Sequence, residues 1–346
     1  MMAWREAAIS VLVVLVYAVQ TGAWDALDNY GADPTKVSVS GVSSGANMAV
    51  QLHVAYSSSI MGVGAVAGGP YYCAQGSSNK AFYGECSTIG NGNNIDVQDL
   101  IDDTDAYAAN GKVDATSNMA SARVYIFSGT EDTIVPTAVV KKLKNYYDHY
   151  VNSASDIMTK YDLPAGHGFI TTDYTNACDN NFASPNINDC NYNMAFEILN
   201  HIYGGNLVDP GSGTTLNGEL LWFDQKPFFP YLWKINPFYM GMAYTGRIYV
   251  PSGCSSSNSG CKLHVALHGC GQSTYSVNDQ YYMHTGYNEV GELNNIIILY
   301  PQGFPNAWYS NPLGCWDWWG YTNSQYATNE GREMVIIKQM IDRILE

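Results

Sequence analysis

The sequence is poor in charge, and in positive charge above all. Charged residues make up 14% of its 346 residues, and 16 Lys and Arg stand against 31 Asp and Glu, which gives a formal net charge of −15. Because nucleic acid is itself a polyanion, no nucleic-acid partner is expected. The sequence also contains no C-x-x-C pair and no N-x-S/T sequon. A zinc site and N-linked glycosylation are therefore not expected.

Long apolar runs are missing as well. The N-terminal run, residues 7–19, has 13 residues, whereas a membrane-spanning helix needs roughly 20. Arg5 precedes this run and small residues follow it, a pattern that predicts a secretory signal peptide over residues 1–23 and leaves an uncleaved anchor as the alternative. We therefore expect a secreted, extracellular protein without membrane contact after cleavage. A monomer is the working expectation.

What the sequence does contain is material for a core, with 46% hydrophobic and 13% aromatic residues. A chain of this length can bury a large core, and we expect residues 24–346 to form one domain. Eight cysteines in a secreted chain suggest disulfides, and their even number leaves none over. On the order of 100 pairings are possible, so the pairing stays open at this point. The cysteines are Cys73, Cys86, Cys178, Cys190, Cys254, Cys261, Cys270 and Cys315.

The stretch VSVSGVSSGANMA, residues 37–49, alternates valine and serine like a strand and then breaks at glycine. Gly41 and Gly45 bracket Ser43 in a G-x-S-x-G pattern. Small residues at these positions let the chain turn sharply from strand to helix and hold the central serine in a strained conformation. A helix N-terminus beside it favours developing negative charge. Ser43 is therefore a candidate nucleophile, although the pattern also arises by chance in a chain with 33 glycines.

Strand-like and helix-like segments alternate, which indicates a parallel sheet with helices on both faces. Strands are expected at 63–69, 122–127 and 156–161 and, beyond a Gly- and Thr-rich linker at 204–218, at 246–253, 262–272 and 295–303. Helices are expected after the glycine turn, at 137–151 and 194–203, in the region that ends at about Asn294, and at 329–346. In an ordinary α/β-hydrolase, several strands and the oxyanion-hole loop precede the nucleophile. Here almost nothing precedes Ser43, and the missing strands lie at the C-terminal end. This order predicts a circularly permuted α/β-hydrolase.

A serine becomes a good nucleophile only when a base takes its proton, and the base needs an acid to orient it. Asp132 lies in a polar loop directly after the strand 122–127, and Glu131 is the rival acid. His167 follows in the loop LPAGHGF. The chain order Ser, Asp, His is that of α/β-hydrolases. The structural alternatives are a turn-forming aspartate and an ordinary loop histidine.

A further loop resembles the one that stabilises the oxyanion formed when a serine attacks an ester. His268 and Gly269 close an apolar strand, which is the arrangement of an oxyanion-hole loop. The amides of Cys270 and of Ser44, the residue after the nucleophile, would be the two donors. A plain glycine turn after the strand is the alternative.

Four tryptophans fall within residues 307–321, a loop too interrupted by Pro and Gly to be a strand core. They suggest an apolar surface near the site, with core packing as the alternative. If Cys315 pairs with Cys270, the disulfide ties this loop to the oxyanion hole. Three of the tryptophans would then be fixed at the mouth of the pocket: Trp316, Trp318 and Trp319.

Together these segments resemble the fungal-type extracellular polyhydroxybutyrate depolymerases, which have a single, circularly permuted α/β-hydrolase domain. The similarity runs from about Asp33 to the C-terminus. It is carried by VSVSGVSSGANMAVQL, AGGPYYCA, SGTEDT, NDCNY, LHVALHGCGQS, NIIILYPQ and NPLGCWDWWGY. The chain departs from the family in its acidic balance and in the aromatic stretch at residues 223–240, which is either packing or an added contact surface.

The resemblance implies a triad of Ser43, Asp132 and His167. It implies an oxyanion hole built from the amides of Ser44 and Cys270. It also implies a substrate contact by Trp318 and no metal or organic cofactor. The disulfides that it implies join successive cysteines: Cys73 to Cys86, Cys178 to Cys190, Cys254 to Cys261 and Cys270 to Cys315.

We therefore interpret the sequence as a serine esterase that cleaves poly(3-hydroxybutyrate), or a similar short-chain polyhydroxyalkanoate, to oligomers and monomer through an acyl-enzyme. The first alternative is another secreted carboxylesterase, of the feruloyl or acetylxylan esterase type. Apolar tryptophans at the mouth favour an aliphatic polyester over a carbohydrate. The second alternative is a non-catalytic binding protein with a hydrolase fold, but such proteins typically lack one member of the triad.

Overall fold

The computed structural model describes most of the chain: residues 25–87, 89–90, 92–211, 213–230, 240–255 and 260–346. The predicted signal peptide, residues 1–23, and residues 231–239 of the aromatic stretch lie outside the described residues. No membrane-spanning helix is found among the residues described.

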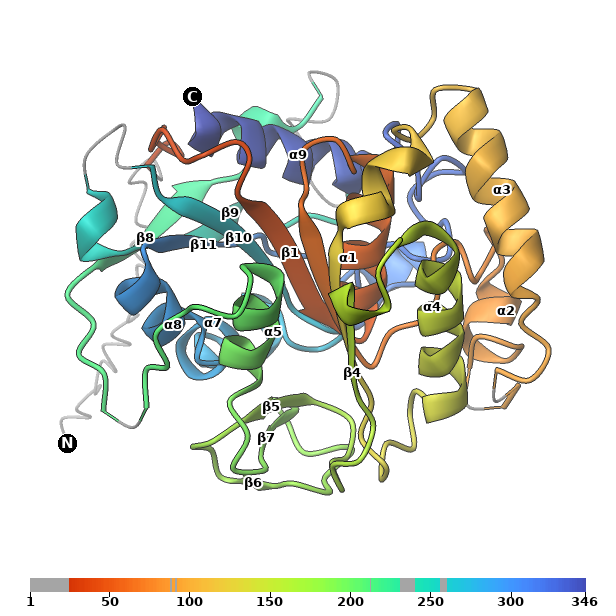
Figure 1. The fold of residues 1–346 in the computed structure, drawn as a ribbon, viewed down its shortest axis with the longest axis horizontal. Helices are drawn as coiled ribbons and strands as arrows, with labels where there is room; N and C mark the ends of the chain where they lie inside the picture. Colours follow the sequence, from red (N-terminus) through yellow and green to blue (C-terminus); the bar gives the residue numbers. More distant parts are fainter. Residues whose placement is uncertain (1–24, 88, 91, 212, 231–239, 256–259) are drawn as a thin grey trace, which may run out of the picture.

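An eight-stranded sheet runs through the middle of the molecule in the order β4-β3-β2-β1-β10-β11-β9-β8 (Figure 1). Its strands are β1 (Val37–Val42), β2 (Gly62–Val66), β3 (Arg123–Phe127), β4 (Ile157–Lys160), β8 (Glu219–Asp224), β9 (Thr245–Val250), β10 (Lys262–Leu267) and β11 (Ile296–Tyr300). Neighbouring strands from β4 to β11 in this order pair in parallel, and only the pairings β11–β9 and β9–β8 at one edge are antiparallel. The mostly parallel sheet predicted from the sequence is confirmed.

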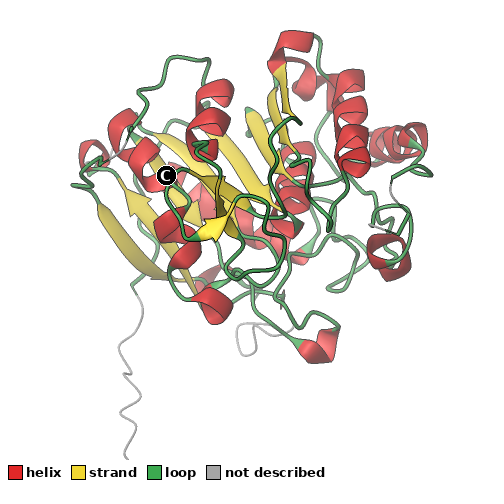
Figure 2. Cartoon of the chain, turned by 90° about the horizontal axis from the view of Figure 1, so that it is seen from below, coloured by secondary structure: helices red, strands yellow, loops and turns green. Residues whose placement is uncertain are grey.

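Helices cover both faces of this sheet (Figure 2). They are α1 (Ser44–Ala55), α2 (Ser78–Phe82), α3 (Val97–Ala109), α4 (Thr137–Tyr150), α5 (Met194–Ile202), α6 (Thr274–Val277), α7 (Gln280–His284), α8 (Tyr287–Asn294) and α9 (Arg332–Leu345). The predicted helices at 137–151, 194–203 and 329–346 are confirmed as α4, α5 and α9. The sequence did not predict α2 and α3.

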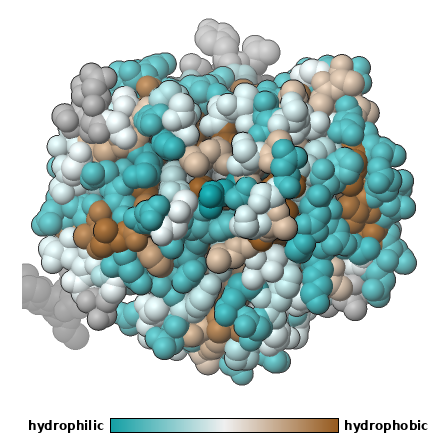
Figure 3. All heavy atoms as spheres, viewed as in Figure 1, coloured by the Kyte–Doolittle hydropathy of each residue, from teal (hydrophilic) through white to brown (hydrophobic). Residues whose placement is uncertain are grey.

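The alternation of side chains along the strands explains the two layers. In β1, Val37 and Val39 enter the core formed with α1, α3, α4 and α9, while Val42 enters the core formed with α5, α7 and α8. Successive side chains of a strand point to opposite faces, so a strand buried on both faces needs apolar residues on both. The outside is different, since the face seen in Figure 3 is mainly hydrophilic and its apolar patches are separate from one another.

The order of the strands in space identifies the permutation. The strand that carries the G-x-S-x-G turn, β1, lies between β2 from the N-terminal half and β10 from the C-terminal half. The end of the chain also returns to its beginning, because the carbonyl of Ile344 in α9 accepts hydrogen bonds from the N–H groups of Tyr30 and Ala32, at 3.1 and 3.4 Å. The closing helix therefore lies beside the segment that leads into β1.

A small second sheet lies beyond the carboxyl ends of the main strands (Figure 1). It consists of β5 (Phe169–Thr171), β6 (Asn176–Ala177) and β7 (Ile187–Asp189) in the order β5-β7-β6. The disulfide between Cys178 and Cys190 links the ends of β6 and β7. The sequence analysis did not predict this sheet, whose strands have only two or three residues each.

Candidate active site

Ser43 occupies a tight turn between β1 and α1. Its backbone has φ 57° and ψ −121°, a conformation that costs free energy for any residue with a side chain. The neighbouring glycines make the turn possible, because a Cβ at Gly41 would collide with the carbonyl of Gly45, and a Cβ at Gly45 with the carbonyl of His268. The N–H of Ser43 donates to the carbonyl of Val66 at 2.8 Å, which fixes the turn to β2.

His167 and Asp132 are brought together from two neighbouring loops. Nδ1 of His167 lies 2.9 Å from Oδ2 of Asp132, and the other carboxylate oxygen accepts hydrogen bonds from the N–H groups of Ile134 and Val135 at 2.8 and 2.9 Å. The Asp132 side chain is 1% exposed and that of His167 is 11% exposed. The rival acid, Glu131, is exposed to solvent.

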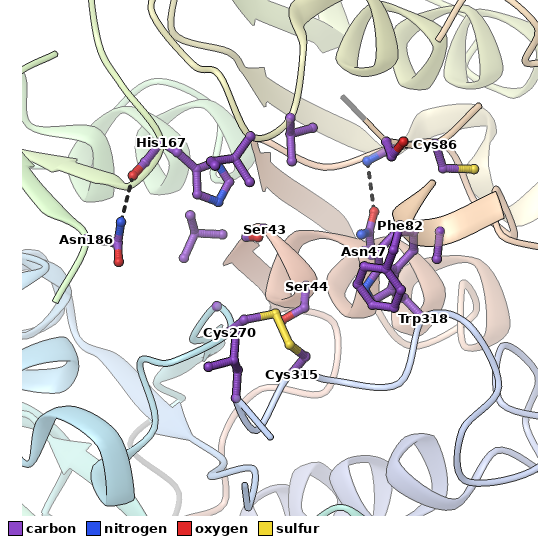
Figure 4. A pocket seen from close by; sticks show the side chains of 18 of the residues that line it. Ser43, Ser44, Asn47, Phe82, Cys86, His167, Asn186, Cys270, Cys315 and Trp318 are labelled. Atoms are coloured by element: carbon purple, nitrogen blue, oxygen red, sulfur yellow. Dashed lines mark hydrogen bonds between the residues drawn. A yellow bond between two sulfur atoms is a disulfide. The ribbon is translucent and has the colours of Figure 1, made fainter. Parts of the chain in front are cut away.

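The ring of His167 points toward Ser43 across a pocket (Figure 4). Since Nδ1 faces Asp132, Nε2 on the other side of the ring faces the pocket that Ser43 lines. Among the described residues no hydrogen bond joins Ser43 and His167. Such bonds are often long in unliganded hydrolases and shorten when substrate binds.

The loop after β10 is shaped by His268, which is fully buried. Its Nε2 accepts the N–H of Gly303 at 3.0 Å, so Nδ1 carries the proton and donates to the carbonyl of Gly269 at 2.8 Å. Burial lowers the pKa of His268 to about 4, so the ring is neutral. The C=O and N–H of a trans peptide point in opposite directions, which turns the N–H of Cys270 away from His268. Within the described residues, neither this N–H nor that of Ser44 has an acceptor.

The four disulfides implied by the resemblance are all present: Cys73–Cys86, Cys178–Cys190, Cys254–Cys261 and Cys270–Cys315. The last one, together with a hydrogen bond from Gly271 N–H to the carbonyl of Leu313 at 2.7 Å, ties the loop after β10 to the tryptophan-rich loop. Cys270 and Cys315 both line the pocket (Figure 4).

Removing the Cys270–Cys315 disulfide is expected to lower activity without unfolding the protein. In a Cys270→Ala/Cys315→Ala variant, the loop loses its covalent anchor, and a displacement of about 1 Å near reacting atoms costs about 100-fold in rate. We expect kcat for a soluble butyrate ester to fall about 10- to 100-fold. The matched control, Cys254→Ala/Cys261→Ala, removes a disulfide at the opposite end of β10 and should keep kcat. Equal kcat in both double variants would show that the tether has no role in the site.

The structure divides the tryptophans predicted to lie at the mouth. Trp318 is half-buried and lines the pocket, but Trp316 and Trp319 are 0% and 4% exposed and do not. The prediction that they lie at the mouth is therefore wrong. Trp316 packs against the ring of His268 and donates its Nε1–H to the carbonyl of that residue at 2.8 Å.

The loop that carries these two rings is organised around the buried carboxylate of Asp317. It accepts hydrogen bonds from four backbone N–H groups and one hydroxyl of residues 319–322. The loop thus wraps around the carboxylate, and Glu333 of α9 accepts the N–H of Asp317 at 2.7 Å. Burial raises the pKa of Asp317 and of Glu333. The sequence analysis did not predict that the carboxylates of Asp317 and Glu333 are buried.

The pocket itself has a volume of about 410 Å³. Ser43 and His167 lie in its wall together with apolar side chains, among them Ile134 and Val135 from the loop after Asp132. A further part of the wall is aromatic, where the ring of Phe82 meets that of Trp318 edge-on at 5.7 Å (Figure 4). The sequence analysis missed Phe82, because α2 has only five residues and no clear apolar period.

The described ends of the aromatic stretch at residues 223–240 belong to the core. Phe223, Phe229 and Met240 are 1%, 2% and 0% exposed. These residues therefore support the packing alternative, while residues 231–239 lie outside the described part of the chain.

Known proteins resemble this chain along most of its length, although no protein-family model matches it. It is 42% identical over 314 residues to poly(3-hydroxybutyrate) depolymerase of Delftia acidovorans, covering 90% of this chain and 60% of that protein. It is 36% identical over 335 residues to polyhydroxybutyrate depolymerase of Talaromyces funiculosus, covering 92% of each. The chain thus spans about 60% of the length of the Delftia relative.

Solved structures of PHB depolymerases also resemble this chain. The crystal structure of PHB depolymerase from Penicillium funiculosum matches with a TM-score of 0.82 at 35% identity, covering 92% of this chain and 98% of that one. A PHB depolymerase with a serine-to-alanine change, complexed with an R3HB trimer, matches with the same TM-score at 34% identity.

The order of the sheet, the turn at Ser43 and the neighbouring His–Asp pair are those of an α/β-hydrolase. Within that class the chain belongs to the polyhydroxybutyrate depolymerase family, a group of carboxylic ester hydrolases.

Proposed function

We propose that this chain is a secreted serine esterase that hydrolyses poly(3-hydroxybutyrate), or a similar short-chain polyhydroxyalkanoate, to oligomers and monomer. The observation that carries the proposal is one apolar-walled pocket lined by Ser43, in its strained turn, and by His167, whose ring is held by buried Asp132. The R3HB trimer bound by a protein of the same fold supports the choice of polyester.

In the proposed mechanism, Ser43 Oγ attacks the carbonyl carbon of the ester while Nε2 of His167 takes the hydroxyl proton. Asp132 holds the ring through Nδ1–H and stabilises the imidazolium that forms. His167 then gives the proton to the departing alcohol oxygen of the polymer, which leaves an acyl group on Ser43. A water molecule, deprotonated by His167, attacks this acyl-enzyme and releases the carboxylic acid and free Ser43.

The amides of Ser44 and Cys270 are the proposed oxyanion donors. The Ser44 amide is at the N-terminus of α1, where the helix dipole adds a favourable positive potential. The Cys270 amide is oriented by the bond from His268 to the preceding carbonyl. Two donors aimed at the developing negative charge are worth several kcal/mol of barrier, roughly 10²- to 10³-fold in rate for each.

Secretion belongs to the same proposal. Four disulfides with no free cysteine among the described residues suit an oxidising environment outside the cell. The signal-peptide pattern at the N-terminus and the resemblance to extracellular depolymerases agree with secretion. We further propose a monomer that needs no partner besides the polyester and has no membrane contact after cleavage.

The direct test offers three substrates to the purified protein. Films of poly(3-hydroxybutyrate), a medium-chain polyester and feruloylated xylan are incubated separately, and released acids are quantified. We expect release from poly(3-hydroxybutyrate) well above release from the other two. Release of ferulate alone would replace the proposal with a feruloyl esterase, and no release from any substrate would favour a binding protein.

Replacing Trp318 should separate polymer hydrolysis from ester chemistry. Its ring offers apolar area that a long chain covers and a small soluble ester barely uses. Burial of such an aromatic contact is worth about 1.5–3 kcal/mol, which corresponds to about 10- to 150-fold in rate. We therefore expect Trp318→Ala to lower hydrolysis of polymer films by that factor and hydrolysis of a p-nitrophenyl butyrate type ester far less.

The control for this experiment is Trp318→Phe, which keeps most of the ring area and should retain most of the polymer activity. If Trp318→Ala lowers both activities equally and melts early, the ring is part of the core rather than of the binding surface. If neither activity changes, the polymer binds without contacting Trp318.

A further inference from the structure

Asn181 makes an unusual set of contacts in the loop between β6 and β7. Its Oδ1 accepts the N–H of His167 at 3.0 Å and the N–H of Thr133 at 2.9 Å. Its Nδ2 donates to the carbonyl of Glu131 at 3.0 Å and to that of Asp179 at 3.1 Å. Both hydrogens of the amide and both lone pairs of its oxygen are therefore used.

These contacts bracket the two residues of the pair described above. Glu131 and Thr133 are the residues directly before and after Asp132, and the third contact is to His167 itself. One side chain thus connects the loop of the acid with the loop of the base. It also lines the same pocket as Ser43.

The loop that carries Asn181 is itself held firmly. Oδ1 of Asn180 accepts the N–H groups of Phe182 and Ala183 at 2.8 and 2.7 Å, and Nδ2 of Asn188 donates to the carbonyl of Asn180 at 2.7 Å. The Cys178–Cys190 disulfide joins the two residues that flank this loop in the sequence. Because its own loop is fixed in this way, the side chain of Asn181 can hold the residues that it contacts in place.

The same loop reaches the third part of the site. Gln272 is buried and lies two residues after Cys270, the proposed oxyanion donor. Its Oε1 accepts the N–H of Gly269 at 2.6 Å. Its Nε2 donates to the carbonyls of Pro185 and Asn186 at 2.7 and 3.0 Å. Asn186 in turn donates to the carbonyl of His167 at 3.2 Å. Residues 180–186 therefore contact the loops of the acid, the base and the oxyanion hole.

We propose that Asn181 is a positioning residue for the ester hydrolysis proposed above: its amide fixes the Asp132 and His167 loops against each other so that Nε2 of His167 is held toward Ser43. The inference rests on that proposed function. Asn181 acts through His167 and takes no part in proton transfer. A carboxylate could not replace the amide, because it would place an oxygen against the carbonyls of Glu131 and Asp179.

Removal of the amide should leave the fold intact. The backbone bonds from Gly166 N–H to the carbonyl of Cys178, and from Phe169 N–H to that of Asn186, still join the loops at 2.8 Å each. The acid loop also keeps its bond from Glu131 N–H to the carbonyl of Ala165 at 3.1 Å. The loss should therefore appear as a small displacement of the pair, and displacements of about 1 Å cost about 100-fold in rate.

The test measures kcat, KM and melting temperature for Asn181→Ala, His167→Ala and the double variant, with a soluble butyrate ester as substrate. We expect Asn181→Ala to lower kcat about 10- to 100-fold with KM within about twofold of the unmodified protein. In the His167→Ala background, the same change should cost less than about twofold, because groups that act as a unit are not additive. A merely structural role would cost the same in both backgrounds.

The matched control is Asn176→Ala. This asparagine lies on the same small sheet, and its Nδ2 donates to the carbonyl of Ala183 at 3.0 Å without touching the acid or base loop. Its kcat should stay within about twofold of the unmodified protein. Should Asn181→Ala fail to fold, Asn181→Asp serves instead: it keeps an acceptor for the N–H groups of His167 and Thr133 but sets its second oxygen against the carbonyls of Glu131 and Asp179, so the same loss of kcat is expected.

Three results would overturn the inference: an unchanged kcat in the Asn181 variant, an equal loss in the His167→Ala background, or an equal loss in Asn176→Ala. These results are distinct from a failure of the proposed function. If His167→Ala keeps the full rate, the proposed triad is wrong and the role of Asn181 is wrong with it. If His167→Ala is inactive and Asn181→Ala is fully active, the inference about Asn181 alone fails.

Discussion

Changing Ser43 to alanine is expected to abolish nearly all ester hydrolysis while the protein folds normally. The triad acts as a unit, so loss of the nucleophile should lower kcat by about 10⁴-fold or more. Alanine keeps the Cβ that already tolerates φ 57° at this position, and the flanking glycines that allow the turn are unchanged. Rates on a soluble butyrate ester and on polymer films, with circular dichroism for folding, measure the effect.

The control for Ser43 is Ser273→Ala, since the Ser273 hydroxyl is buried without a partner in the described structure and does not line the pocket. This variant should keep its rate. A fluorophosphonate should label Ser43 in the unmodified protein and should leave Ser273 and Ser128 unlabelled. Near-normal turnover in Ser43→Ala, or a label on another serine, would end the assignment of the nucleophile.

Changing Asp132 to asparagine should cost about 10⁴-fold in kcat, although the side chain keeps its shape. Oδ1 accepts two backbone N–H groups, from Ile134 and Val135, so the amide oxygen of the variant must stay there. Its NH₂ group then faces Nδ1 of His167 and forces the ring proton onto Nε2. A ring with a proton on Nε2 cannot accept the proton of Ser43.

Glu131→Gln is the matched control for this experiment, because Glu131 is the neighbouring, exposed carboxylate. It should keep its rate, measured as kcat on the soluble ester. If Glu131→Gln loses activity and Asp132→Asn does not, the acid has been assigned to the wrong residue.

The residues proposed to carry the chemistry of the site could be singled out in the sequence because their signals are local. The alternation of Val37 and Val39 with serines predicts a strand, and Gly41 and Gly45 four residues apart predict the turn that holds Ser43. Asp132 could be placed because it directly follows an apolar strand, where a parallel sheet presents its loops. The position of β10 and β11 near the C-terminus was enough to predict the permutation.

The tryptophan-rich loop shows where such signals fail. Composition and spacing cannot distinguish an apolar surface from a core, and Trp316, Trp318 and Trp319 look alike in the sequence. The structure separates them. Trp316 bonds to the carbonyl of His268, and the residues from Trp319 onward fold around the carboxylate of Asp317. Both rings are buried, and Trp318 is the one of the three that lines the pocket.

The sequence by itself determined the class of fold, the turn at Ser43 and the chain order of Ser43, Asp132 and His167, since the strand-like segments and the residues that follow each of them can be read along the chain. Only the tertiary structure decided what holds these parts in register. Asn181 contacts residues 48 and 50 positions away beside Asp132, and Gln272 contacts a carbonyl 87 positions away. Asparagine and glutamine carry no periodic or charge signal, and their role arises only when distant backbone groups meet in the folded chain and need hydrogen-bond partners.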